Sequence, residues 1–280
     1  MQVERIIPRR GINDENRGKK HALYRLISSS TADYVWLQDD DIVAPAATDE
    51  EVLAAIGDAD MLILPLRMES ENVRPSLLER LQMAEYAAIQ QLTLESAVRG
   101  HAVMCSSANM VVRRERWLES YRDLHPDIAS GDDMFLLESF KRRGLKIITL
   151  NTRHSTLNSP QSSLNFQRST LNSFTATVRP EKSWGAFFRQ RMRWAGKASA
   201  YTDRDIVVCG ALITVGNVLQ FLCPAFVLVK FPFDYGFIRR SGSEVSFGIA
   251  LLLALLYPYY MLVCLVGGMI KTRLAKSKTW

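Results

Sequence analysis

The stretch "VWLQDDDIVAP", residues 35–45, joins a predicted buried strand to three consecutive aspartates, Asp39, Asp40 and Asp41. Adjacent like charges repel each other, so something must offset them: solvent, arginine side chains or a metal ion. Side chains at a strand end alternate between two sides, so we expect Asp39 and Asp41 on one side and Asp40 on the other. Two carboxylates on one side form a hard-oxygen site for magnesium or manganese, while a solvated acidic turn is the plainer alternative.

Strands and helices alternate along residues 1–203. The spacing of apolar residues predicts helices over 18–30 and 75–100, and strands over 33–38, 60–68, 101–107 and 109–114. Residues 132–150 have the pattern of a helix, a glycine stop and a strand. This alternation predicts an α/β layered domain over residues 1–203, in which the Ser-, Thr- and Asn-rich residues 151–178 form a polar loop insertion.

The end of the chain has a different composition. Residues 206–229 and 245–270 contain no charged side chain, and about 20 apolar residues span a bilayer core. We therefore predict transmembrane helices at 206–231 and 245–270. The alternative is a pair of buried core helices in a soluble domain.

The distribution of basic residues predicts the orientation of these helices. The tail at residues 271–280 carries Lys271, Arg273, Lys276 and Lys278 and no acidic residue, which places it in the cytoplasm by the positive-inside rule. Two spans then put the N-terminal domain on the same side. Much of the net charge of +6 is thereby explained by attraction to a lipid bilayer. We expect no nucleic-acid partner, because no basic array is interleaved with aromatic residues.

A second acidic pair, Asp132 and Asp133 in "SGDDMFLL", opens a predicted helix. Aspartates at a helix N-terminus bind free amide groups and suit the helix dipole, so capping is one interpretation. A carboxylate within hydrogen-bond reach of a hydroxyl can also act as a general base. The pair alone does not decide between these roles.

A third candidate lies in "FFRQRMRWAGK", residues 187–197. On a helix, Gln190, Arg193, Trp194 and Lys197 share one face. An indole stacks on sugars or bases, and Arg and Lys hold phosphate. An interfacial amphipathic helix with aromatic anchors is the alternative, and both roles are compatible.

Taken in order, these segments resemble the processive and polymer-type members of the family 2 glycosyltransferases, which have a GT-A fold. The matching segments are "GKKHAL" at 18–23, Asp-x-Asp at 39–41, "NMVVRR" at 109–114, Gly-Asp-Asp at 131–133 and "QRMRW" at 190–194. Membrane helices follow them in the family, and the last two motifs look like the bacterial membrane-bound branch.

The resemblance implies a function and a role for each motif. The chain would be an inverting, metal-dependent glycosyltransferase of the hexosyltransferase class. It would use a nucleotide-sugar donor, a glycan or lipid acceptor and a divalent cation, Mn or Mg, at the cytoplasmic face of the inner cell membrane. The implied roles are metal binding by Asp39 and Asp41, donor binding by Lys19, Asp39, Asp40 and Asp41, catalysis by Asp133 with Asp132 beside it, and diphosphate and acceptor binding by Gln190, Arg193 and Trp194.

One part of the family pattern is not visible in this sequence. The pattern begins with a strand–helix–strand half that builds much of the nucleotide pocket, and here only "RIIP" at residues 5–8 has the pattern of a strand edge. The resemblance therefore implies a domain without its first βαβ half, completed by an upstream segment or a partner subunit. A truncated, non-catalytic membrane-anchored remnant is the alternative. A metal-dependent phosphohydrolase would use the same aspartates but has no need of the Gln-x-x-Arg-Trp face.

Overall fold

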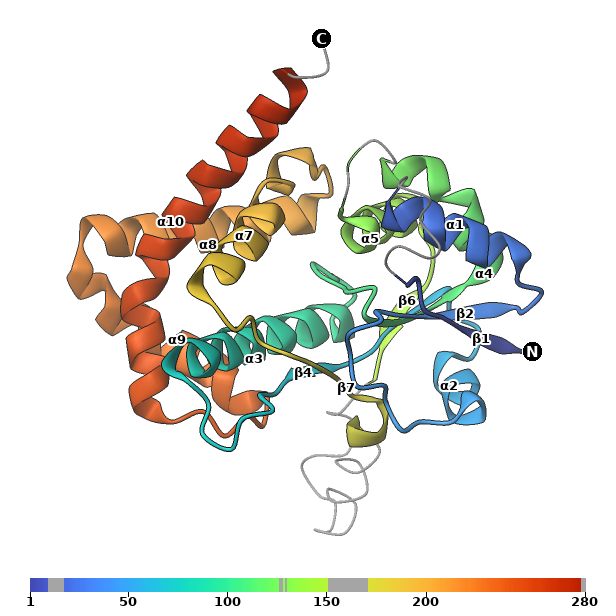
Figure 1. Ribbon diagram of the computed structural model, residues 1–280, viewed down its shortest axis with the longest axis horizontal. Helices are drawn as coiled ribbons and strands as arrows, with labels where there is room; N and C mark the ends of the chain where they lie inside the picture. The colour runs from blue at the N-terminus through green and yellow to red at the C-terminus, as the bar shows by residue number, and fades with distance from the viewer. Residues whose placement is uncertain (10–17, 126–127, 129, 151–170, 278–280) are drawn as a thin grey trace. The chain divides into compact units, whose positions relative to one another are not determined.

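The computed structural model describes residues 1–9, 18–125, 128, 130–150 and 171–277 (Figure 1). The chain forms two compact units, which we describe separately. Unit 1 consists of Met1–Arg67 and Thr93–Val178, and unit 2 of Met68–Leu92 and Arg179–Trp280. The first contains Asp39 and Asp132, and the second contains Gln190 and the apolar helices.

Unit 1 is built on a five-stranded mixed sheet. Its strands, in spatial order, are β1 (Val3–Ile6), β2 (Tyr34–Gln38), β5 (Asn109–Arg113), β3 (Met61–Ile63) and β6 (Ile147–Thr149). The β1–β2 and β3–β6 pairs are parallel, and β5 runs antiparallel to both of its neighbours. The predicted strand edge at 5–8 is thus the end of β1, at one edge of this sheet.

Helices cover both faces of the sheet, which confirms the predicted α/β class. Figure 1 shows α1 (Lys19–Ser29), α4 (Arg114–Glu119) and α5 (Asp132–Arg142) on one face and α2 (Asp49–Ile56) on the other. Val52 and Ile56 of α2 are buried in a cluster with Tyr34 and Trp36 of β2. Such a three-layer arrangement buries both faces of the strands, which explains the continuous apolar run before Asp39.

The "NMVVRR" segment holds this core together. Asn109 is fully buried, accepts a hydrogen bond from Trp36 Nε1 at 2.9 Å, and donates to the carbonyl groups of Pro65 and Phe174. The Arg113 side chain pairs with Asp60, and that of Arg114 donates to the Ile27 carbonyl. These contacts satisfy buried polar groups, so they give the segment a structural role.

Several predicted elements differ from those in the structure. The predicted strand 60–68 is divided into β3 and β4 (Leu66–Met68), because Pro65 lacks the N–H that a ladder requires. Residues 101–107 are irregular rather than a strand, and α2 was not predicted. The predicted loop 151–178 ends in a strand, β7 (Ala176–Val178), which pairs with β4. Residues 151–170 of that loop lie outside the described residues.

Unit 2 is helical. Its main elements are the start of α3 (Leu77–Val98), then α7 (Trp184–Ala195), α8 (Arg204–Leu222), α9 (Val227–Arg240) and α10 (Phe247–Ser277). The predicted single helix at 206–231 is therefore incorrect. Helix α8 ends at Leu222, and α9 begins only after a turn that contains Pro224. The break follows because proline cannot donate the backbone hydrogen bond of a continuing helix.

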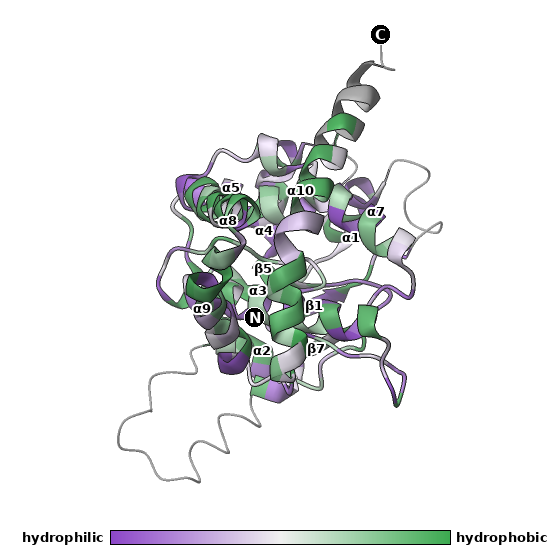
Figure 2. Cartoon of the chain, turned by 90° about the vertical axis from the view of Figure 1, so that its left-hand side faces the viewer, coloured by the Kyte–Doolittle hydropathy of each residue, from purple (hydrophilic) through white to green (hydrophobic). Residues whose placement is uncertain are grey.

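Two of these helices are long and apolar enough to cross a membrane: α8 and the part of α10 at Phe247–Gly268. Figure 2 shows hydrophobic colour along both. Only 17% of the apolar window in α8 and 39% of that in α10 is buried within the protein. A core helix in a soluble domain buries most of its apolar face, so these values fit that alternative poorly.

The backbones of α7 and α10 approach closely at Gly268. A Cβ atom added there would lie 2.7 Å from the Met192 carbonyl oxygen and 2.8 Å from the Gly196 amide nitrogen. Because backbone atoms cannot move aside cheaply, we expect Gly268→Ala to lower the free energy of unfolding by about 1–3 kcal/mol. Denaturant unfolding in detergent measures this change.

Gly216→Ala in α8 is the matched control for this prediction. A Cβ atom added to Gly216 has no heavy atom within 4 Å. The control is therefore expected to be neutral or to stabilise the chain by up to about 1 kcal/mol. Equal unfolding midpoints for the two variants would contradict the close approach at Gly268.

Candidate active site

The centre of the candidate site in unit 1 is the Lys19 ammonium group. Lys19 Nζ donates to Asp39 Oδ1 at 2.5 Å and to Ser107 Oγ at 2.7 Å, and it lies 3.3 Å from Asp132 Oδ2. One side chain thus connects the segments that carry Asp-x-Asp and Gly-Asp-Asp. The two motifs are distant in sequence, and the fold brings them to one point.

Local structure delivers each of these groups to that point. Lys19 is the first residue of α1, after Gly18, whose φ of 84° lies in a region that L-residues rarely adopt. Asp39 follows the last residue of β2, and Asp132 opens α5 after Gly131, which has a φ of 88°. In open α/β sheets, ligands gather at the ends of strands and at helix N-termini, and this site has both.

Each charge in this cluster stabilises its opposite. Burial lowers the pKa of Lys19, but Asp132 and Asp39 outweigh that effect and hold the pKa above its usual range. Burial raises the pKa of Asp132, but the Lys19 charge outweighs it and keeps the pKa below its ordinary value. The pair is therefore charged at neutral pH. Its contribution to stability disappears only as pH falls through the lowered carboxyl pKa or rises through the raised ammonium pKa.

Asp132 and Asp133 have different surroundings. Asp132 is 7% exposed and directed to Lys19. Asp133 is only partly buried. Its Oδ1 accepts a hydrogen bond from the Met134 amide, and its backbone carbonyl accepts one from Cys105 Sγ. Burial, with the nearby charges of the two aspartates, raises the pKa of Cys105, so this thiol is a packing group rather than a nucleophile.

The other two aspartates of the triplet lie in a turn. Asp40 and Asp41 are exposed, and β2 ends at Gln38. The strand alternation used to predict their directions therefore stops before Asp39. The charge of Asp39 is offset by the Lys19 ammonium group. A lysine was not among the partners that the sequence suggested for the triplet, which were solvent, arginine and a metal ion.

The donor set constrains how a metal ion could bind here. Among the described residues, no group of three or more His, Cys, Asp and Glu side chains is placed to hold one. Mg²⁺ and Mn²⁺ in nucleotide sites commonly take only one or two carboxylates and complete their shells with water and phosphate oxygens. The predicted pair, Asp39 and Asp41, would need that second arrangement, in which the nucleotide brings part of the coordination shell.

The Gln-x-x-Arg-Trp motif lies in unit 2, on α7. Arg193 is exposed and Trp194 is half-buried. The Gln190 Nε2 atom donates to Glu181 Oε1 at 3.1 Å, so its amide is already engaged within unit 2. Helix α7 ends at Ala195, so Lys197 lies beyond it and does not share its helical face as predicted.

The most buried charge of this motif, Arg191, was not predicted from the sequence. Its guanidinium group donates to Glu85 Oε2 at 2.6 and 3.1 Å, and it also donates to Gln190 Oε1. It lies over the Trp194 ring, 4.3 Å from the centroid. Arg191 thus contacts and positions two residues of the motif, Gln190 and Trp194.

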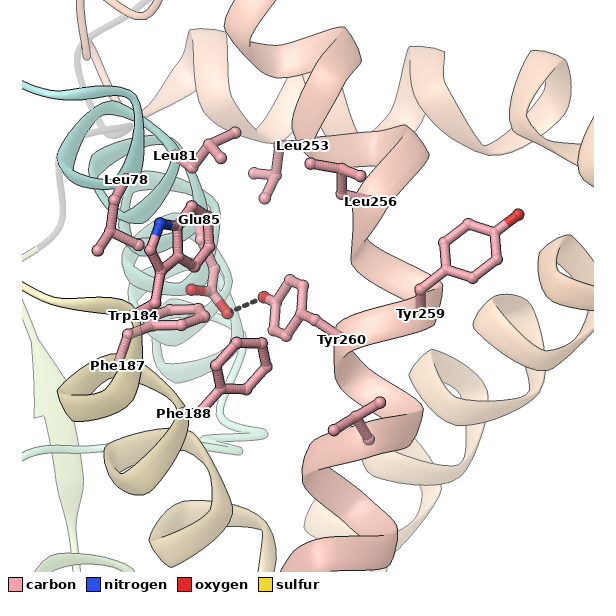
Figure 3. Close-up of a pocket in the computed structure, with 11 residues that line it drawn as sticks. Leu78, Leu81, Glu85, Trp184, Phe187, Phe188, Leu253, Leu256, Tyr259 and Tyr260 are labelled. Carbon is pink, nitrogen blue, oxygen red and sulfur yellow. Dashed lines mark hydrogen bonds between the residues drawn. The ribbon is translucent and has the colours of Figure 1, made fainter.

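Unit 2 also contains a hollow of about 350 Å³ beside this network (Figure 3). The lining side chains come from α3, α7 and α10 and are apolar or aromatic apart from one carboxylate. Glu85 is that carboxylate, and it accepts a hydrogen bond from the Tyr260 hydroxyl. Leu256, Tyr259 and Val263 of the wall are substantially exposed on a candidate membrane span. The lining of the hollow is thus apolar and aromatic, with Glu85 as its charged group.

Comparisons with solved structures give low similarity. A mycobacterial protein matches at 16% identity over 67% of this chain and 53% of its own, with a TM-score of 0.31. Glucosyl-3-phosphoglycerate synthase from Mycobacterium tuberculosis matches in two complexes. The complex with phosphoglyceric acid matches at 19% identity over 56% of this chain and 53% of its own, with a TM-score of 0.27. The complex with uridine diphosphate matches at 21% identity over 55% of this chain and 53% of its own, with a TM-score of 0.25.

The chain therefore spans about half the length of the solved structures it matches. A search of curated proteins finds no match. A family model, described as glycosyltransferase-like family 2, matches residues 1–197, which include every motif named above. The chain belongs to the glycosyltransferase-like family 2.

Proposed function

We propose that this chain transfers a sugar from a nucleotide-sugar donor to a glycan or lipid acceptor at the cytoplasmic face of the inner cell membrane. The observation that carries the proposal is the Lys19 ammonium group, which joins Asp39 of Asp-x-Asp to Asp132 of Gly-Asp-Asp. At this point the lysine offers positive charge to a phosphate, and the two aspartates offer negative charge to a cation.

The proposed chemistry is direct displacement at the anomeric carbon with inversion. Asp133, partly exposed beside the buried Asp132, would accept the proton of the acceptor hydroxyl. Lys19 would hold the diphosphate of the donor, where negative charge develops as the sugar leaves. A bound Mn²⁺ or Mg²⁺, held by Asp39 and Asp41, would supply further positive charge against that leaving group.

The motif in unit 2 would serve the diphosphate and the acceptor. Arg193 is exposed and carries a permanent charge, and Trp194 offers a ring held by Arg191. The hollow beside α7 favours the lipid class of acceptor over the glycan class, because its apolar wall would shed water against a hydrocarbon chain. The low burial of α8 and of the α10 span supports a multi-pass membrane location.

A donor-turnover assay tests this proposal. The chain, purified in detergent, is incubated with a panel of UDP-, GDP- and dTDP-sugars, manganese and a lipid extract, and release of nucleoside diphosphate is measured. We expect release from one donor class that depends on the extract. Absence of release from every donor, in a chain that still binds nucleotide, would support the non-catalytic remnant instead.

A further inference from the structure

The contacts of Lys19 imply an order of binding at the site. The ammonium group reaches three separate segments: the turn after β2, the turn before β5 and the start of α5. About a third of its side chain is exposed, so it can be approached from solvent. It occupies the position between the two carboxylates where a cation would otherwise be attracted.

The buried carboxylate makes this position costly to leave empty. Asp132 Oδ2 is buried and has no hydrogen-bond partner among the described residues, so the ion pair with Lys19 at 3.3 Å, together with Ser107 at the same carboxyl group, stabilises its charge. A buried charge that loses its partner carries a large desolvation penalty. Lys19 is therefore expected to leave Asp39 and Asp132 only when another positive charge replaces it.

A divalent cation alone is a poor replacement. It would have to displace an ammonium group of like charge, and no third His, Cys, Asp or Glu side chain among the described residues is placed to help hold it. A cation that arrives with a nucleoside diphosphate avoids both problems. The phosphates attract the displaced ammonium group and contribute the missing ligand oxygens.

We propose that Lys19 is a built-in counter-ion that excludes divalent cations from Asp39 and Asp132 until a nucleoside diphosphate binds. The lysine would then transfer from the carboxylates to the phosphate, which would leave Asp39 and Asp132 free to hold a cation. This inference deepens the proposed function and rests on it for the identity of the phosphate ligand. The exclusion of the cation by Lys19 does not depend on the proposed function, because it is a property of the protein without nucleotide.

Manganese binding without nucleotide tests that exclusion. Free Mn²⁺ is counted by electron paramagnetic resonance during titration of the wild type, Lys19→Met and Lys19→Arg, all in detergent. Removal of the ammonium charge leaves two carboxylates without their shared positive partner, so Lys19→Met is expected to bind Mn²⁺ at least about tenfold more tightly than the wild type. Lys19→Arg keeps the charge and is expected to behave like the wild type. Equal affinities in the wild type and Lys19→Met would overturn the inference.

Two further measurements separate the possible failures. Lys19→Met/Asp39→Asn should lose the manganese site that the single variant gained, and retention of that site would also overturn the inference. If Lys19→Met does not fold, the wild type alone decides, because tight Mn²⁺ binding without nucleotide contradicts the exclusion. A wild type that binds no nucleotide under any condition would overturn the proposed function, while the manganese comparison would still decide the role of Lys19.

Discussion

Glu85→Leu is expected to lower the free energy of unfolding by about 3–5 kcal/mol, because it leaves the Arg191 guanidinium group buried without its partner. Both side chains of this ion pair are at most 6% exposed, and two hydrogen bonds join them. Leucine also removes the acceptor of the Tyr260 hydroxyl. Denaturant unfolding in detergent measures the loss.

The double variant Glu85→Leu/Arg191→Leu is the control for this prediction. Replacing both members of a buried pair with apolar groups is often close to neutral, so the double variant is expected to recover much of the lost stability. A loss below about 1 kcal/mol in the single variant would place the pair in a solvated environment. Such a result would contradict the buried position of Arg191 over the Trp194 ring.

The second large effect is on turnover. Asp133→Asn is expected to lower the rate of diphosphate release by about 10²–10⁴-fold, which is the usual contribution of a general base. Its affinity for nucleoside diphosphate is expected to stay near that of the wild type, because the carboxylate that lies 3.3 Å from Lys19 Nζ is that of Asp132. Turnover and calorimetric binding on the same preparation measure the two quantities.

Asp132→Asn provides the contrast for this prediction. Asp132 pairs with Lys19, so its loss is expected to change nucleotide and manganese affinity as well as turnover. Turnover by Asp133→Asn at the wild-type rate would contradict its role as the base. In that case the capping interpretation of the pair at the start of α5 would be the better one.

Local patterns predicted those parts of the fold that depend on neighbouring residues. Apolar spacing located α1, α3 and α5, and a short continuous apolar run located β2, which is buried on both faces. Helix α2 was missed although its start was readable: Thr48 and Glu51 form a reciprocal capping box. The break in the 60–68 strand was also readable from Pro65, since a proline in a central strand removes a ladder donor.

The sequence named candidate site residues but not the contacts among them. The motif order identified Lys19, Asp39 and Asp132, yet the ammonium group that joins them follows from the meeting of α1, β2 and α5 in three dimensions. Arg191 and Glu85 lie 106 residues apart, so no local pattern links them. A buried glutamate in the otherwise apolar stretch of α3 was the one available signal, because an isolated charge in such a position requires a partner.

The central claim, that the Asp39–Lys19 cluster binds a nucleoside diphosphate with a divalent cation, is tested most directly by calorimetric titration of UDP. The purified wild type and Asp39→Asn/Asp41→Asn are titrated in detergent with and without manganese. We predict UDP binding by the wild type that manganese strengthens by about tenfold or more, and loss of that manganese effect in the variant. UDP binding of equal strength in both proteins, unchanged by manganese, would contradict the claim.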